Sequence, residues 1–84
     1  MRYTVASTPF ANHQLAEIWL RAANPQDVTD ASDRIEAALR NDPDRVGEPR
    51  RDGRRVIVLP PLSVTFEVSV DDRRVTIVSI RYRP

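Results

Sequence analysis

Arginine is the residue type in this sequence best suited to binding an anionic target. All 13 basic residues are arginine. Residues 1–44 hold four arginines against seven acidic residues, a net charge of −3, whereas residues 45–84 hold nine against five, a net charge of +4. A guanidinium binds phosphate or carboxylate through two parallel hydrogen bonds, so the second half is predicted to carry a basic, anion-binding surface. A GC-rich genome would give the same preference for arginine without any such function.

Other reactive side chains are few. The chain has no cysteine and one histidine, His13. The lack of cysteine excludes disulfide bonds, thiolate zinc sites and a cysteine nucleophile, and it is typical of a protein of the reducing cytoplasm. His13 falls on the polar side of a predicted helix and is expected to be an exposed residue without a role. We predict no metal ion and no other cofactor.

A length of 84 residues allows a single domain, residues 1–84, with one small core. The N-terminal residues read directly into a strand, and no apolar run approaches the roughly 20 residues of a membrane span. Neither secretion nor a membrane partner is therefore expected, and the expected location is the cytoplasm.

The first half of the chain has helical periodicity. Residues 2–7 are predicted to form a strand. Apolar residues then recur at helical spacing and predict two helices, the second running from about Gln26 to Asn41, with a break at Asn24-Pro25. Trp19 falls on the apolar stripe of the first helix and is expected in the core. Two helices joined by so short a break form an antiparallel hairpin.

The second half of the chain has the period of two that is typical of strands. Residues 43–53 are predicted to be a loop, and residues 54–59, 62–70 and 75–82 to be strands. The last strand is apolar on both faces, so we place it centrally in the sheet. The predicted fold is α+β, in the order β-α-α-β-β-β, with the helical hairpin packed on one face of a mostly antiparallel four-stranded sheet. The other face, with Ser63, Thr65, Glu67 and the arginine-rich segments, is predicted to stay partly open and to hold the functional surface.

The order of elements and several short patterns together resemble the RelE/ParE family of toxins. Each pattern is only a few residues long, but the ordered set covers nearly the whole chain. The patterns are Leu15 to Trp19, Ile35 to Leu39 followed by Asp42-Pro43, Gly47 to Arg50, Gly53 to Arg55, Val64 to Val68, Asp71-Asp72 and Val75 to Arg83.

The resemblance implies a toxin of a type II toxin–antitoxin system, neutralised by a cognate antitoxin whose flexible segment wraps around it. Family members differ in activity. Some are mRNA endonucleases that act on the ribosome by metal-free attack of the 2′-OH, and others inhibit DNA gyrase. The target is therefore left open between ribosome-bound mRNA, gyrase and, for a degenerate toxin-like domain that only binds protein, neither.

If the chain is an RNase, the resemblance assigns roles to five residues. Glu48 lies where some of these nucleases keep a carboxylate base, and Arg83 together with Arg54 or Arg55 would stabilise the scissile phosphate. Tyr82 would stack on a base. Three further arginines are expected to contact nucleic acid, namely Arg50, Arg51 and Arg81.

Two departures from the nucleases argue against catalysis. Ser63 stands where they commonly have an arginine, and the chain stops at Pro84, without the tyrosine or helix that often follows the last strand. The alternative interpretation is structural: the loop arginines protect an edge strand from aggregation, Glu48 pairs with a neighbouring arginine, and Arg81 and Tyr82 complete the sheet.

Overall fold

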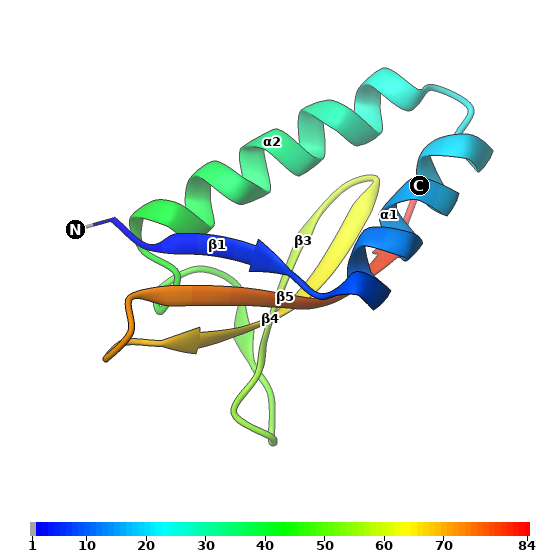
Figure 1. Cartoon of the computed structure of the whole chain (residues 1–84). Coiled ribbons are helices and arrows are strands. Elements are labelled where there is room, and N and C mark those ends of the chain that lie inside the picture. The colour runs from blue at the N-terminus through cyan, green and yellow to red at the C-terminus, as the bar shows by residue number, and fades with distance from the viewer. Residues whose placement is uncertain (1) are drawn as a thin grey trace.

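The chain folds in the predicted order, with one additional short strand (Figure 1). The computed structural model describes residues 2–84. Its elements are β1 (Thr4–Ser7), α1 (Pro9–Arg21), α2 (Pro25–Asn41), β2 (Glu48–Pro49), β3 (Arg55–Leu59), β4 (Leu62–Ser69) and β5 (Arg74–Tyr82). They form one sheet in the order β1-β5-β4-β3-β2, in which β1 is parallel to β5 and all other neighbours are antiparallel. The predicted α+β fold is confirmed, but the sheet has five strands because Glu48 and Pro49, assigned above to a loop, pair with β3.

Both helices begin where the sequence supplies a capping side chain and a proline. Thr8 Oγ1 accepts a hydrogen bond from a backbone N–H three residues on, and Asn24 Oδ1 accepts one from two residues on, each at 3.1 Å. Pro9 and Pro25 follow in the first turn, where a missing N–H costs no helical hydrogen bond. The predicted break at Asn24-Pro25 is therefore confirmed.

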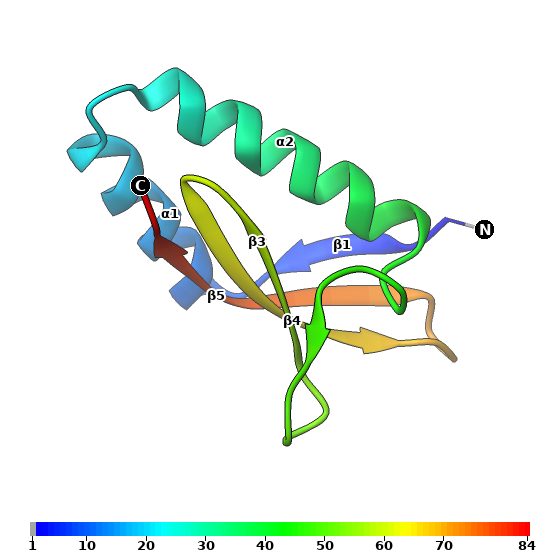
Figure 2. The same cartoon turned by 180° about the vertical axis from the view of Figure 1, so that it is seen from behind.

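The helical hairpin covers one face of the sheet, and Figure 2 shows the same layers from behind. α1 packs mainly against β5, and α2 crosses over β1, β3 and β4. The core lies between these layers. Neither helix described within residues 2–84 is long and apolar enough to cross a membrane. The buried apolar residues are Ala11, Ile18, Val28, Ala31, Ile35, Leu39, Leu62, Val64, Phe66, Val75, Ile77 and Ile80.

β5 lies inside the sheet, as predicted, but only its first half has strands on both sides. β1 ends at Ser7, and α1 takes its place beside the second half of β5. The backbone N–H of Ile80 donates to Gln14 Oε1 at 2.7 Å, and the N–H of Thr8 donates to the carbonyl of Ile77 at 3.0 Å. Thr8 and Gln14 therefore supply hydrogen-bond partners for backbone groups of β5 that would otherwise form an open sheet edge.

Trp19 is not a core residue, and that prediction is wrong. Its exposed fraction is 48%. α1 packs mainly on β5, so its buried side centres on Ala11 and Ile18, and Trp19 lies about 100° further round the helix. His13 is exposed, as expected, with Nε2 3.4 Å from Glu17 Oε1.

Candidate functional site

The face of the sheet away from the helices is built by alternate residues of three strands. Leu62, Val64 and Phe66 of β4 are buried under the helices, so their neighbours in the sequence point to the other side. The register then places the remaining outward residues beside them. The open sheet face, as we call it, consists of Arg54, which precedes β3, and in β3, β4 and β5 of Val56, Val58, Ser63, Thr65, Glu67, Ser69, Arg74, Thr76, Ser79 and Arg81, and Glu48 of β2 aligns with Val56 on the same face.

The charged residues of the open sheet face lie at its two ends and, with Glu48, at its β2 edge. Thr65 and Ser79 are paired at its centre and contribute two hydroxyl groups. Ser63 is only 8% exposed, because its cross-strand neighbours Val58 and Arg81 flank it. The predicted arginine-lined face is thus a hydroxyl and valine surface with an arginine near each end.

Arg54 and Arg55 lie on opposite faces of the sheet. Arg54 Nε is 3.8 Å from Glu67 Oε1, on the open sheet face. Arg55 pairs in register with the buried Phe66 and therefore points toward the helix side. Its Nε donates to the carbonyl of Val46 at 3.0 Å, and its Nη2 donates to the carbonyl of Gly47 at 3.2 Å. Of the two arginines proposed to hold a phosphate, only Arg54 is available on the open sheet face.

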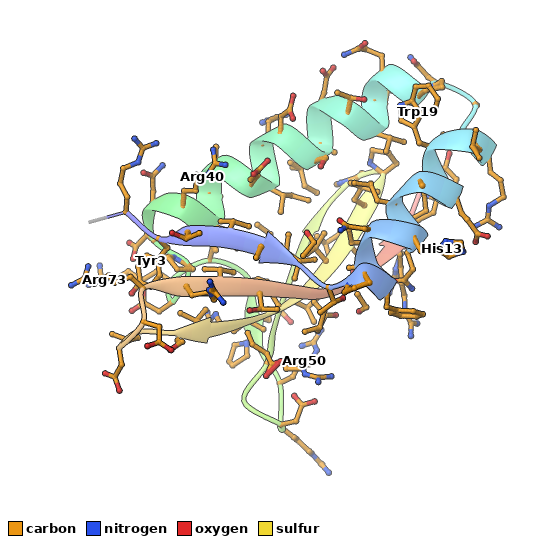
Figure 3. All side chains as sticks on the ribbon, in the orientation of Figure 1. Tyr3, His13, Trp19, Arg40, Arg50 and Arg73 are labelled. Carbon is orange, nitrogen blue, oxygen red and sulfur yellow. The ribbon has the colours of Figure 1, made fainter. Side chains whose placement is uncertain are left out.

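Glu48 is held by an arginine of its own loop. Its Oε2 lies 3.3 Å from Arg50 Nη1, and both side chains are exposed. Arg51 is exposed at the following turn. Figure 3 shows Arg50 below the sheet, away from both helices. The ion pair agrees with the structural interpretation of Glu48, in which its carboxylate pairs with a neighbouring arginine.

The end of β5 divides its residues between the two faces. Tyr82 pairs with the buried Leu62, so its ring lies on the helix side, half-buried against the core. Arg81 points to the open sheet face. The backbone N–H of Arg83 donates to the carbonyl of Pro61 at 2.6 Å. Within residues 2–84, neither Arg81 nor Arg83 forms an ion pair.

Glu48 and Tyr82, two of the proposed catalytic residues, lie far apart on the sheet. Across the sheet, Glu48 of β2 lies in the same row as Val56 of β3, Thr65 of β4 and Ser79 of β5. Ser79 is thus three strands from Glu48, and Tyr82 lies three residues further along β5. Steps of about 4.8 Å between strands and about 3.4 Å along a strand then give roughly 17 Å between the Cα atoms of Glu48 and Tyr82. In Figure 2 the C-terminus lies beside α1, away from the green segment that follows α2. Glu48 aligns with the open sheet face and Tyr82 lies on the helix side, so the carboxylate proposed as base and the ring proposed to stack on a nucleobase do not face each other.

One neighbour of Arg81 was missed by the sequence. Arg21, in the last turn of α1, lines the same hollow, which we call the Arg21–Arg81 hollow. The hollow is lined by Gln14, Glu17, Ile18, Arg21, Ile80, Arg81 and Tyr82. The sequence places Arg21 on the polar side of its helix, but only the packing of α1 beside β5 brings it to Arg81.

The described residues offer no obvious metal centre. Across residues 2–84 no three histidine, cysteine, aspartate or glutamate side chains are grouped so that they could hold a metal ion.

Neither a family model nor a curated protein matches the sequence. Two solved structures match its fold. A chain of the toxin–antitoxin complex RelBE2 from Mycobacterium tuberculosis is 22% identical, with a TM-score of 0.81, over 99% of this chain and 93% of that chain. A chain of the chromosomal ParDE toxin–antitoxin system from P. aeruginosa is 19% identical, with a TM-score of 0.68, over 99% and 98%. The chain therefore has a RelE/ParE-like toxin fold.

Proposed function

We propose that this chain is the toxin of a type II toxin–antitoxin pair and that a cognate antitoxin neutralises it. The observation that carries the proposal is the likeness of 99% of the chain to chains from two toxin–antitoxin complexes. The proposal rests on fold, and the binding surface must be argued from the residues.

The basic end of the open sheet face is the best place for an acidic antitoxin segment. Arg21 and Arg81 line one hollow, and Arg83 follows two residues later. The loop arginines are less suitable, because Arg50 and Arg54 already lie near carboxylates. An unpaired guanidinium can form charge-assisted hydrogen bonds with a carboxylate without first giving up an internal partner.

The geometry supports action by binding rather than by RNA cleavage. The spacing of strands and residues in the sheet puts the Cα atoms of Glu48 and Tyr82 roughly 17 Å apart. Arg55 already donates hydrogen bonds to two backbone carbonyls. Ser63, which pairs with Arg81 near one end of the face, supplies no charge there. We therefore favour a target that is bound, such as gyrase or another protein, over cleavage of ribosome-bound mRNA.

The test is induced expression with and without the neighbouring reading frame. Growth, mRNA 5′-end mapping and the DNA damage response are read in parallel. Growth arrest that co-expression relieves, with a complex recovered by pull-down, supports the toxin assignment. Growth unaffected by expression, with a stable monomer and no complex, contradicts it.

The binding surface is tested with a matched pair of variants on one strand. Arg81→Glu should weaken the complex, whereas Arg74→Glu makes the same charge change at the far, exposed end of β5 and should not. Mapping of mRNA 5′ ends, together with the DNA damage response, distinguishes RNA cleavage from inhibition of gyrase. New mRNA ends that vanish in Glu48→Gln and Arg83→Ala would favour the endonuclease instead, and intact mRNA with an induced damage response would favour gyrase.

A further inference from the structure

The segment that joins β2 to β3 is a narrow hairpin that projects from the sheet. We call residues 48–55 the Arg51 hairpin, after the residue at its tip. The backbone N–H of Gly53 donates to the carbonyl of Arg50 at 3.3 Å, which places Arg51 and Asp52 at the turn. Figure 1 shows this light-green loop extending beyond the sheet and away from both helices. A rise of about 3.4 Å per residue puts the tip roughly 7 Å beyond the end of β2.

The Arg51 hairpin is held in one conformation by its own hydrogen bonds. The backbone N–H of Arg50 donates to the carbonyl of Arg54 at 2.7 Å, and Asp52 Oδ1 accepts from the backbone N–H of Arg54 at 3.2 Å. At the base of the hairpin, Arg55 donates to two carbonyls of the segment before β2. The hairpin is therefore preorganised, and a ligand that binds it pays little for ordering the loop.

The charges of the Arg51 hairpin leave one guanidinium uncompensated at the tip. The hairpin holds four arginines against two carboxylates, a net charge of +2. Glu48 Oε2 lies 3.3 Å from Arg50 Nη1, and Asp52 Oδ2 lies 3.9 Å from Arg54 Nε. Arg51 is exposed, and within the described part of the chain it forms no ion pair. The projecting tip thus presents a free, rigidly placed cation.

The composition of the hairpin decides which anionic ligand suits it. Residues 48–55 contain no aromatic residue, and Pro49 is their only apolar side chain. Single-stranded nucleic acids are bound by stacking of bases on aromatic rings, and protein partners by buried aromatic or aliphatic anchors. Double-stranded DNA needs neither, because its phosphates bind arginine and its narrow minor groove attracts arginine through enhanced negative potential. Duplex RNA offers only a wide, shallow minor groove.

We propose that the Arg51 hairpin binds double-stranded DNA, with Arg51 in the minor groove and Arg50 at a phosphate. The minor groove is about 6 Å wide, so it admits a side chain but not a two-stranded ribbon, and only the tip enters. A phosphate replaces Glu48 as the partner of Arg50, because an exposed ion pair is easily exchanged. The hairpin lies beside Arg54, at the opposite end of the open sheet face from Arg81, so this inference goes beyond the proposed function and does not depend on it.

Fluorescence anisotropy of labelled DNA, titrated with the full chain at two salt concentrations, tests the proposal. An A·T-rich duplex should bind at least about threefold more tightly than a G·C-rich duplex, since its minor groove is narrower. Arg51→Ala should weaken binding by at least about fivefold and should reduce the dependence of log affinity on log salt by about one. Arg34→Ala, which removes the same charge from an exposed position of α2, should change neither quantity.

Glu48→Gln gives a change in the opposite direction. It should tighten binding of the duplex, because Arg50 loses its internal partner and is free for a phosphate. Melting curves check that each variant is folded. The proposal is overturned if the duplex does not bind at low salt, if Arg51→Ala binds normally, or if Glu48→Gln binds more weakly. Equal or tighter binding of single-stranded DNA or of duplex RNA would also overturn it. Growth arrest and its relief by the neighbouring reading frame are unaffected by any of these outcomes.

Discussion

Replacing Arg55 should destabilise the protein far more than replacing Arg54, although the two are adjacent in sequence. Arg55 is half-buried and donates to two carbonyls, at 3.0 and 3.2 Å, in the segment that leads into β2. A hydrogen bond from a charged donor contributes about 1.5–3 kcal/mol when it is buried. We discount this for partial exposure to solvent and expect Arg55→Ala to lower the free energy of unfolding by about 2 kcal/mol in total.

Arg54 offers a matched control. Its contacts with Asp52 and Glu67 are 3.9 and 3.8 Å long and exposed, and such pairs contribute about 0–1 kcal/mol. For a domain of this size 1 kcal/mol corresponds to about 4–8 °C in Tm, so Arg55→Ala should lower Tm by about 8–16 °C and Arg54→Ala by less than half of that.

Thermal unfolding followed by circular dichroism measures both variants, and growth arrest on induction measures function. Equal losses of Tm would refute the assignment of Arg55 as a structural residue. An Arg55→Ala protein with normal Tm and lost activity would return Arg55 to the functional surface, and would show that its contacts with Val46 and Gly47 are unimportant for stability.

Three further predictions follow from individual contacts. Gly47→Ala should cost clearly more stability in urea unfolding than Gly53→Ala: both glycines have positive φ, at a cost of about 1–2 kcal/mol for alanine, but only at Gly47 would the new Cβ lie 2.4 Å from a backbone oxygen. Trp19 should be readily quenched by acrylamide, because its side chain is half-exposed, and a protected tryptophan would contradict the packing of α1. If an anionic partner binds at Arg81, its affinity should fall as salt rises, and Arg81→Ala should reduce that dependence; a salt-independent affinity would exclude a phosphate-rich target.

The elements were predictable from the sequence because most of them have a clear period. Phe66 and its alternating neighbours define β4, and Asn24-Pro25 separates the helices. Two features had no such signal. Glu48-Pro49 is too short to show a period and becomes a strand only through its pairing with β3. Trp19 shares the spacing of the core residues, and its exposure depends on whether α1 packs mainly on β5 or on α2.

The candidate site was less predictable, because its geometry depends on which face each strand residue occupies. β3 is apolar at four consecutive positions, Val56 to Leu59, so alternation could not show that Arg54 and Arg55 point to opposite sides. The pairing of Arg55 with the buried Phe66 shows that Arg55 points to the helix side and Arg54 to the open sheet face. The same alternation of side chains places Arg81 and Tyr82 of β5 on opposite faces of the sheet. Residues that are close in sequence are thereby divided between a binding face and the core side.

The alternation of side chains between the two sheet faces also predicts the spacing of acidic residues in a ligand of the open sheet face. Arg54 and Arg81 point to this face from two strands apart and about four rows apart in the ladder. Sheet spacings of about 4.8 and 3.4 Å place their Cα atoms roughly 17 Å apart, a distance that an extended segment covers in about five residues. Because side chains of an extended segment alternate between two sides, the two acidic residues must be an even number of positions apart. A peptide with acidic residues about six positions apart should therefore bind more tightly than the same peptide with a spacing of two, by isothermal titration calorimetry. Arg54→Ala should remove the difference, because one carboxylate then loses its partner, and equal affinities for the two spacings would show that the arginines do not act on a common ligand.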